Sequence, residues 1–236
     1  MTDVPTLIKP YKRKAWKPLT TDGDTVLTGS KFSGMPWLAK GEQWPHCQNC
    51  DKPMQLFLQL NLDELPPSER GKFGSGLLQM FYCTNSDPLC EVDCEAFFPF
   101  AKSALLRIIQ PHGEAEEVSI ADEQGMFPAR AIKEWQEMDD YPNWEESAEH
   151  GLELSDTEWE SIEEDYPRPG DKLEGWPNWV QGVEYPNCPV CNERMEMVFQ
   201  IDSEDNLPYM FGDVGCGHIT QCKTHKEQIA FGWACG

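Results

Sequence analysis

The chain has 236 residues, of which 39% are hydrophobic and 11% aromatic, and its 41 acidic and 19 basic side chains give a formal net charge of −22. This length suffices for a hydrophobic core in one domain or two small ones, and the aromatic content argues against a disordered chain. The sequence shows neither a secretory signal nor an apolar run of the ~20 residues that span a membrane. Its negative charge would repel nucleic acid and anionic lipid. We therefore expect a soluble, cytoplasmic monomer.

An internal repeat organises the chain. Residues 29–59 match residues 170–200 at a constant offset of 141 positions, with ten of 31 residues identical and no gap. Chance would give about two identities, because common residues each occur at roughly 5–7%. The Gly-rich segments GKFGSG and GDVGCG pair at the same offset. The sequence therefore predicts two related modules with a pseudo-two-fold arrangement.

Each module reads as a β-rich hairpin. A loop containing Gly and Pro leads into Cys-x-x-Cys and a strand-like run, and a Gly-rich turn precedes a second run. We expect an N-terminal arm over 1–28, a first repeat over 29–112, an acidic insert over 113–167 and a second repeat over 168–236, all in one compact domain. The predicted strands are Met54–Leu60, Leu77–Cys83, Ala104–Ile109, Met195–Ile201 and His218–Cys222.

The acidic insert has a different character. From Gly113 to Asp165 it holds nineteen acidic and two basic residues, which accounts for most of the net charge. A helix is predicted over Ala129–Met138, where Ile132 and Trp135 are three residues apart, and another over Ser155–Glu164, which opens with a Ser-x-x-Glu capping box. The fold class predicted is therefore α+β. The acidic run is either a solvated face or an anionic surface for a basic protein partner.

Ten cysteines in a cytoplasmic chain point to metal binding more than to disulfides. Cys47 and Cys50 have the spacing that lets one turn supply two thiolates to a zinc ion. In an antiparallel hairpin, the start of the first strand lies beside the end of the second, where Cys83 stands. Cys90, across a short turn, is the favoured fourth ligand, and Cys94 is an alternative.

The second repeat offers a Cys₃His set. Cys188 and Cys191 correspond to the first pair, and Cys222 ends the second strand, followed three residues later by His225. Cys94, Cys216 and Cys235 remain alternatives for the fourth ligand positions and otherwise read as small buried side chains. Two structural zinc ions are the expected cofactors, against the alternative of reduced cysteines without metal.

No catalytic motif accompanies these cysteines. A catalytic zinc needs an open coordination position and a general base, and the His-x-Glu element of nucleic-acid deaminases does not fit the residues around Pro45-His46-Cys47. The chain also has no phosphate-binding Gly-Lys-Ser/Thr loop. We therefore expect a protein that is not an enzyme.

The segments KFSGMPWLAKGEQWP and LPYMFGDVGCGHI resemble the YwqG-like family of bacterial proteins of unknown function, with Ser33-Gly34-Met35-Pro36 where that family often has Gly-Gly-x-Pro. This resemblance implies a duplicated α+β fold. The cysteine-bearing form is also similar, more distantly, to the programmed cell death protein 2 family. That resemblance implies zinc ligation by Cys47, Cys50, Cys83 and Cys90, and a role as chaperone of a basic ribosomal protein.

The predicted function is binding of a basic protein client. A groove between the repeats, lined by exposed Trp37, Trp44 and Trp179, would hold the client, while the acidic insert would speed the encounter. Two alternatives remain open from the sequence. One is an immunity-type inhibitor of a basic toxin protein, and the other is a hydrolase or transferase whose site no motif reveals.

Overall fold

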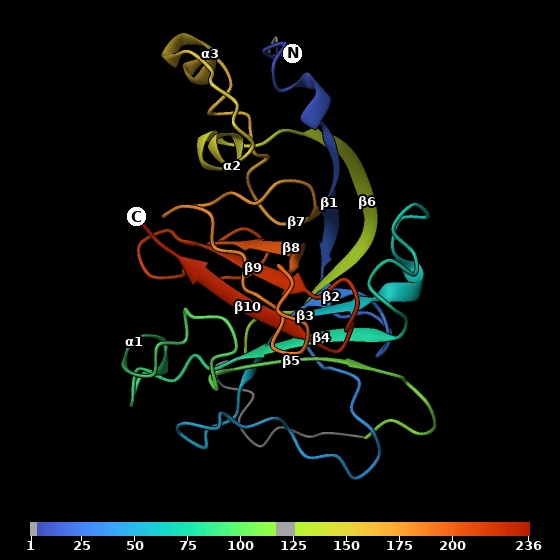
Figure 1. Ribbon diagram of the computed structural model, residues 1–236. Helices are drawn as coiled ribbons and strands as arrows, with labels where there is room; N and C mark the ends of the chain where they lie inside the picture. Colours follow the sequence, from blue (N-terminus) through green and yellow to red (C-terminus); the bar gives the residue numbers. More distant parts are fainter. Residues whose placement is uncertain (1–3, 117–125) are drawn as a thin grey trace.

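Antiparallel strands dominate the structure, a computed structural model that describes residues 4–116 and 126–236 (Figure 1). The described strands are β1 (Arg13–Asp22), β2 (Lys31–Phe32), β3 (Gln55–Asn61), β4 (Leu77–Tyr82), β5 (Ala104–Ile109), β6 (Arg130–Asp140), β7 (Lys172–Glu174), β8 (Glu196–Asp202), β9 (Cys216–Gln221) and β10 (Ile229–Ala234). The described helices are short: α1 (Cys90–Asp93), α2 (Trp144–Glu149) and α3 (Asp156–Glu160), with 3₁₀ turns at Lys9–Tyr11 and Leu62–Glu64. The predicted β-rich character is confirmed, but the helical share is smaller than an α+β class implies.

One sheet contains these ten strands in the order β10-β9-β8-β7-β1-β6-β2-β3-β4-β5. The long strands β1 and β6 pair at its centre, from Arg13 opposite Asp140 to Asp22 opposite Arg130. The edge strands β5 and β10 approach each other, so the sheet is a nearly closed barrel (Figure 1). Strand β1 lies within the region expected to be an N-terminal arm, and it links the two halves because it pairs with β7 on one side and β6 on the other.

The helix expected over Ala129–Met138 is wrong, because these residues form most of β6. The pairing with β1 places Glu134 opposite Leu19 and Ile132 opposite Thr20, which leaves Lys133 as an extra residue. Such a bulge shifts the alternation by one, so residues three apart share a face. Ile132 and Trp135 both contact the main core for this reason. The three-residue spacing that suggested a helix therefore arises from a strand with a bulge.

The second predicted helix is confirmed in a shorter form, as α3. Ser155 and Glu158 form the capping box, in which the Ser155 backbone N–H donates to Glu158 Oε2 at 2.9 Å. Trp159 and Ile162 are buried in a small cluster that includes Ile8. The helices α2 and α3 thus lie against the N-terminal residues at one end of the molecule (Figure 1). Residues 117–125 of the predicted acidic insert lie outside the described residues.

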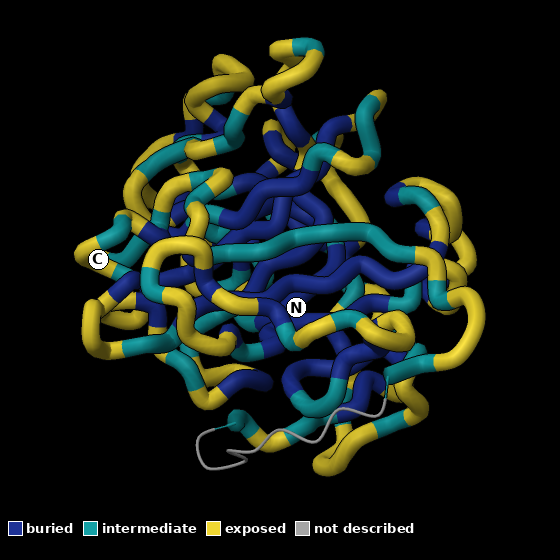
Figure 2. Tube along the Cα trace, turned by 90° about the horizontal axis from the view of Figure 1, so that it is seen from below, coloured by how far each residue is buried: buried dark blue, intermediate teal, exposed yellow. Residues whose placement is uncertain are grey.

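The main core fills the space inside the curved sheet, where much of the chain is buried (Figure 2). Strands β3, β4, β8 and β9 are buried along most of their length, whereas β1, β5 and β6 are largely exposed or half-buried. Its large side chains are mostly aromatic, with Phe57, Tyr82 and Phe211 in mutual ring contact. No helix in the described parts of the chain is long and apolar enough to cross a membrane.

The predicted aromatic groove is corrected by the structure. Trp37 and Trp179 are only 6% and 7% exposed, and Trp44 is half-buried with its indole N–H donating to Met54 O at 2.8 Å. Loop segments are docked here onto buried glutamines, since Gln59 Oε1 accepts from Trp37 N and Gln200 Oε1 accepts from Asn178 N. These tryptophans therefore pack beneath the loops and do not form the exposed aromatic surface that was expected, although Trp179 borders a cavity of about 300 Å³ together with Phe98 and Trp233.

Two buried lysines tie loops to the strands β7 and β2. Lys172 Nζ donates to Asp140 Oδ2 at 2.9 Å and to Arg168 O at 2.6 Å. Lys31 Nζ donates to Asp24 Oδ1 at 2.6 Å and to Met35 O, in the loop after β2, at 2.7 Å. The pairs differ in burial, because Asp140 is fully buried whereas the Asp24 side chain is 33% exposed.

Candidate metal centres

The first candidate centre brings together Cys47, Cys50, Cys83 and Cys90, whose sulfur atoms all lie within 4.8 Å of one another. Cys47 Sγ is 3.9 Å from Cys90 Sγ, and Cys50 Sγ is 3.6 Å from Cys83 Sγ. A tetrahedral ion with metal–sulfur bonds of ~2.3 Å requires sulfur–sulfur separations of about 3.8 Å. Disulfides need a far shorter separation, and the four cysteines are free thiols. These residues can therefore hold one metal ion.

Local folding explains this geometry. Cys47 N–H donates to Lys52 O and Asp51 N–H donates to Cys47 O, which closes a tight turn around the Cys-x-x-Cys pair. Asp51 has a φ of 57°, a left-handed conformation that Asp and Asn adopt more readily than most residues. The pairing of Gln55 with Tyr82 then sets the end of β4 beside this turn and delivers Cys83, and α1 begins at Cys90.

The second candidate centre brings together Cys188, Cys191, Cys222 and His225, also within 4.8 Å. Cys191 Sγ lies 3.6 Å from Cys222 Sγ, and His225 Nδ1 lies 3.8 Å from Cys188 Sγ and 3.7 Å from Cys222 Sγ. Its turn repeats that of the first centre, since Cys188 N–H donates to Glu193 O and Asn192 has a φ of 59°. The histidine thus occupies the place that a fourth cysteine has in the first centre.

Backbone amides point at the sulfur atoms in both centres. Asn49 N–H donates to Cys47 Sγ at 3.4 Å, Val190 N–H to Cys188 Sγ at 3.4 Å, and His225 N–H to Cys222 Sγ at 3.3 Å. Hydrogen bonds of this kind stabilise thiolates, the form of cysteine that binds metal. These hydrogen bonds therefore favour the deprotonated, negatively charged form of the three cysteines.

The thiol pKa values respond to these surroundings. The His225 amide is the main cause that lowers the pKa of Cys222 to about 6, while burial raises the pKa of Cys83 to about 12 and that of Cys90 well above its usual value. Without a cation, Cys83 and Cys90 would keep their protons at neutral pH. A bound ion would displace them, so metal binding at the first centre is coupled to proton release.

The residues of the first candidate centre are largely enclosed by protein, whereas Cys191 and His225 of the second are only partly buried. Cys47, Cys83 and Cys90 are almost fully buried among apolar side chains that include Leu56 and Phe81. An ion bound by all four residues of either set would have a complete tetrahedron, without the open position that a catalytic zinc uses. Ser103, which sequence reasoning did not identify, supports the first centre because its Oγ lies 3.9 Å from Cys47 Sγ and accepts from Asn49 Nδ2 at 2.8 Å.

The three remaining cysteines lie outside the two centres. Cys94 packs against the apolar cluster around the first centre, Cys216 is buried in β9, and Cys235 packs at the main core. Cys216 Sγ lies 3.7 Å from His218 Nε2, a buried ring whose pKa burial lowers to about 3. The sequence suggested that all three are small buried side chains; Cys216 is buried, whereas Cys94 and Cys235 are only partly buried.

No curated protein matches the sequence. A family model described as "domain of unknown function (DUF1963)" matches residues 30–231, which covers most of the chain, both candidate centres included. The chain therefore belongs to the DUF1963 family of domains of unknown function.

Proposed function

We propose that the protein is a cytoplasmic, non-enzymatic zinc protein that binds a basic protein client through an acidic surface, in the manner of a chaperone. The observation that carries this proposal is an exposed tryptophan among carboxylates that have no ion-pair partner within the part of the chain that the structure describes. The resemblance to the YwqG-like and programmed cell death protein 2 families, the second of which implies such a role, supports it. Ten free cysteines suit a reducing compartment.

Zinc is the ion that these donor sets favour. Four thiolates, or three thiolates and an imidazole, in a closed tetrahedral arrangement are typical of structural zinc, whereas harder cations prefer oxygen ligands. Both centres lie at the start of a strand pair, between the Cys-x-x-Cys turn and the end of the partner strand. The ions would tie these hairpin ends to the loops that follow.

The proposed binding surface is the acidic cap, defined as residues 144–165, which comprise α2, α3 and the turns around them. Trp144 is 53% exposed and rests edge-on against Trp159, with ring centroids 5.5 Å apart. Exposed carboxylates without an ion-pair partner among the described residues are Glu153, Asp156, Glu160, Glu163 and Glu164. Tryptophan is a frequent anchor of protein interfaces, and unpaired carboxylates attract Lys and Arg.

We predict that client binding depends on both parts of the acidic cap. The client is first identified by native mass spectrometry of the untagged protein from its own cells, where a retained basic polypeptide is expected. Trp144→Ala should weaken its binding by about tenfold or more, as loss of an interface anchor does. Combined Glu160→Lys and Glu163→Lys should slow association and remove its dependence on salt.

A matched control is Glu64→Lys, which reverses an exposed carboxylate outside the cap and should leave the affinity unchanged. The proposal is contradicted if no basic polypeptide is retained, or if Glu64→Lys weakens binding as much as the cap variants do. A complex that never releases its client would instead support the immunity-type inhibitor.

A further inference from the structure

The cavity of about 300 Å³ lies over strands β9 and β10, and we call it the β9–β10 cavity. Its lining includes His218 and Thr220 of β9, Gly232 of β10, the segment 97–99 and, from the loop before the second Cys-x-x-Cys turn, Glu184. Its aromatic lining consists of Phe97, Phe98, Trp179 and Trp233. An apolar lining with a few polar groups is typical of sites for small ligands.

The internal repeat shows what stands at the corresponding place in the first half of the sheet. Strand pairing puts three pairs of residues at corresponding positions: Gln59 and Gln200, Gln79 and His218, Arg107 and Gly232. The side chain of Arg107 therefore has no counterpart in the second half. A Cβ atom at position 232 would lie 3.2 Å from Phe97 O, so the segment 97–99 lies against this glycine. The cavity remains between that segment and the loop of Glu184.

Arg107 shows which chemistry this position holds in the first half. Its Nε donates to Gln79 Oε1 at 2.9 Å, and its Nη1 donates to Glu42 Oε1. The central carbon of its guanidinium group lies 5.7 Å from the centre of the Phe81 ring. A carboxylate, a neutral acceptor on the central strand and an aromatic ring thus surround the guanidinium group there.

The second half keeps a similar environment without a cation in it. Glu184 stands one residue after the position that corresponds to Glu42, and it has no ion-pair partner in residues 4–116 and 126–236. Partial shielding from water raises the pKa of its carboxyl. The ring of His218 is neutral at pH 7, because burial lowers its pKa to about 3, and so does not repel a cation. The hydroxyl oxygen of Thr220 is buried without a hydrogen-bond partner among the described residues, and a ligand with N–H groups would satisfy it.

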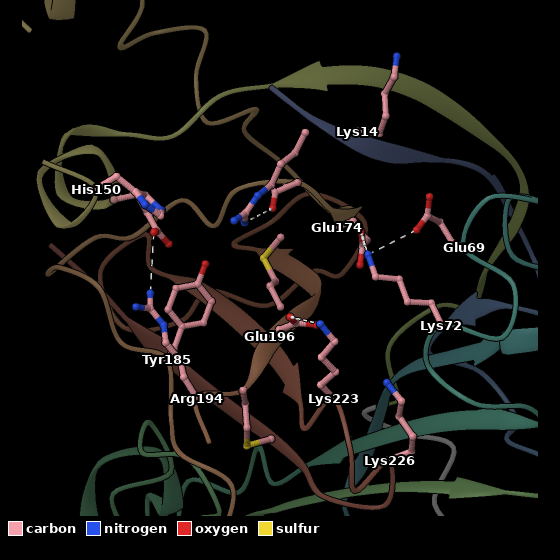
Figure 3. Close-up of a pocket in the computed structure, with 15 residues that line it drawn as sticks. Lys14, Glu69, Lys72, His150, Glu174, Tyr185, Arg194, Glu196, Lys223 and Lys226 are labelled. Atoms are coloured by element: carbon pink, nitrogen blue, oxygen red, sulfur yellow. Dashed lines mark hydrogen bonds and ion pairs between the residues drawn. The ribbon is translucent and has the colours of Figure 1, made fainter. Parts of the chain in front are cut away.

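A larger cleft, of about 910 Å³, does not have this imbalance (Figure 3). Lys72, Lys223 and Lys226 line it, but Lys72 Nζ contacts Glu174 and lies 3.8 Å from Glu69 Oε2. Most of its cations thus face carboxylates of the protein itself. The β9–β10 cavity differs because its carboxylate faces no cation of the described chain.

We propose that the β9–β10 cavity binds a guanidinium group, with its charge against Glu184 and its flat face against the aromatic lining. The group would stand in the second half of the sheet where Arg107 stands in the first. A guanidinium suits this lining better than an ammonium group, because it is planar, stacks on aromatic rings and donates hydrogen bonds in several directions. The volume is enough for a small guanidine or for the end of an arginine side chain.

The test is a nuclear magnetic resonance titration of the full-length protein with propylguanidinium, followed at the indole N–H signals. Saturable shifts are expected for Trp179 and Trp233, which line the cavity, and none for Trp135, which does not. Glu184→Gln should weaken binding about tenfold or more, the effect of losing a hydrogen bond between charged groups. Phe98→Ala should weaken it about two- to fivefold, as loss of an exposed cation–π contact does.

The matched control is Glu64→Gln, which removes an exposed carboxylate outside the cavity and should leave binding unchanged. Thermal unfolding of each variant checks that it folds. Free arginine and an arginine capped at both ends distinguish two sources of the group. Tighter binding of the capped form indicates an arginine side chain of a protein, and tighter binding of the free form indicates a small molecule.

Four outcomes would overturn the proposal. Absence of saturable shifts would mean that the cavity binds no guanidinium, and equal binding of the neutral isostere propylurea would mean that charge is not recognised. Tighter binding of propylammonium would assign the site to ammonium groups, and equal weakening by Glu64→Gln and Glu184→Gln would mean that Glu184 has no particular role. The proposal does not rest on the client proposal, since Trp144→Ala should leave propylguanidinium binding unchanged.

Discussion

Replacing Cys50 or Cys191 with serine should remove one of two zinc ions and lower the melting temperature by about 10 °C or more. The binding free energy of a structural zinc is folding free energy, ~10–16 kcal/mol in isolated finger peptides. In a chain of this size, a loss of 1 kcal/mol lowers the melting temperature by roughly 2–4 °C. Native mass spectrometry gives the metal count and calorimetry gives the melting temperature.

The two variants address the two centres separately, since Cys50 and Cys191 occupy corresponding places in their turns. Cys94→Ser is the matched control, because Cys94 packs beside the first centre without belonging to its ligand set; it should retain both ions. Loss of an ion from Cys94→Ser, or retention of both by Cys50→Ser, would show that the ligand set of the first centre is wrong. A wild-type protein without metal would contradict the zinc assignment at both centres.

Lys172→Met should destabilise the protein by about 3–5 kcal/mol, because it leaves the fully buried Asp140 carboxylate without its cation. Asp140 is not otherwise isolated, since it accepts backbone N–H bonds from Tyr141, Arg168 and Trp176. Those bonds position the carboxylate but do not neutralise it. The loss is measured as the change in free energy of unfolding by urea denaturation.

Lys31→Met provides the comparison within the same chain. Lys31 is as buried as Lys172, but the Asp24 side chain that it pairs with is 33% exposed and can be solvated when the lysine is removed. The free energy of unfolding should therefore fall less for Lys31→Met than for Lys172→Met. Equal losses would mean that exposure of the carboxylate does not decide the cost of breaking these pairs.

The two candidate metal centres were predictable because their residues follow short-range patterns. Each Cys-x-x-Cys pair lies in one turn, and Cys222 and His225 are three residues apart. The prediction needed one long-range contact, between the start of the first hairpin strand and the end of the second. Antiparallel pairing with its two-residue alternation of side chains brings Cys83 and Cys222 beside the Cys-x-x-Cys turns. The sequence could not show Ser103, which reaches the first centre from the end of another connection.

The predictions that were wrong concern segments whose structure depends on which other part of the chain they pack against. Ile132 and Trp135 have helical spacing, but the pairing with β1 makes Lys133 a bulge residue and the segment a strand. Trp37 and Trp179 were expected to be exposed, because a loop in the sequence looks solvated until its docking on Gln59 and Gln200 is known. Local spacing is compatible with more than one structure in each of these cases.

The sequence by itself determined the repeat, the β-rich hairpins, the eight candidate ligands and the capping box of α3, since each depends on residues close together in the chain or at a constant offset. Only the tertiary structure decided that β1 and β6 join the two halves, that Trp144 is the exposed aromatic of the acidic cap, and that Lys72 lines the same cleft as Lys223 and Lys226. The physical reason is that pairing between strands brings together side chains that lie more than a hundred residues apart in the sequence. Which strands pair is decided by burial of the common hydrophobic core, and not by the surface side chains that become neighbours as a result.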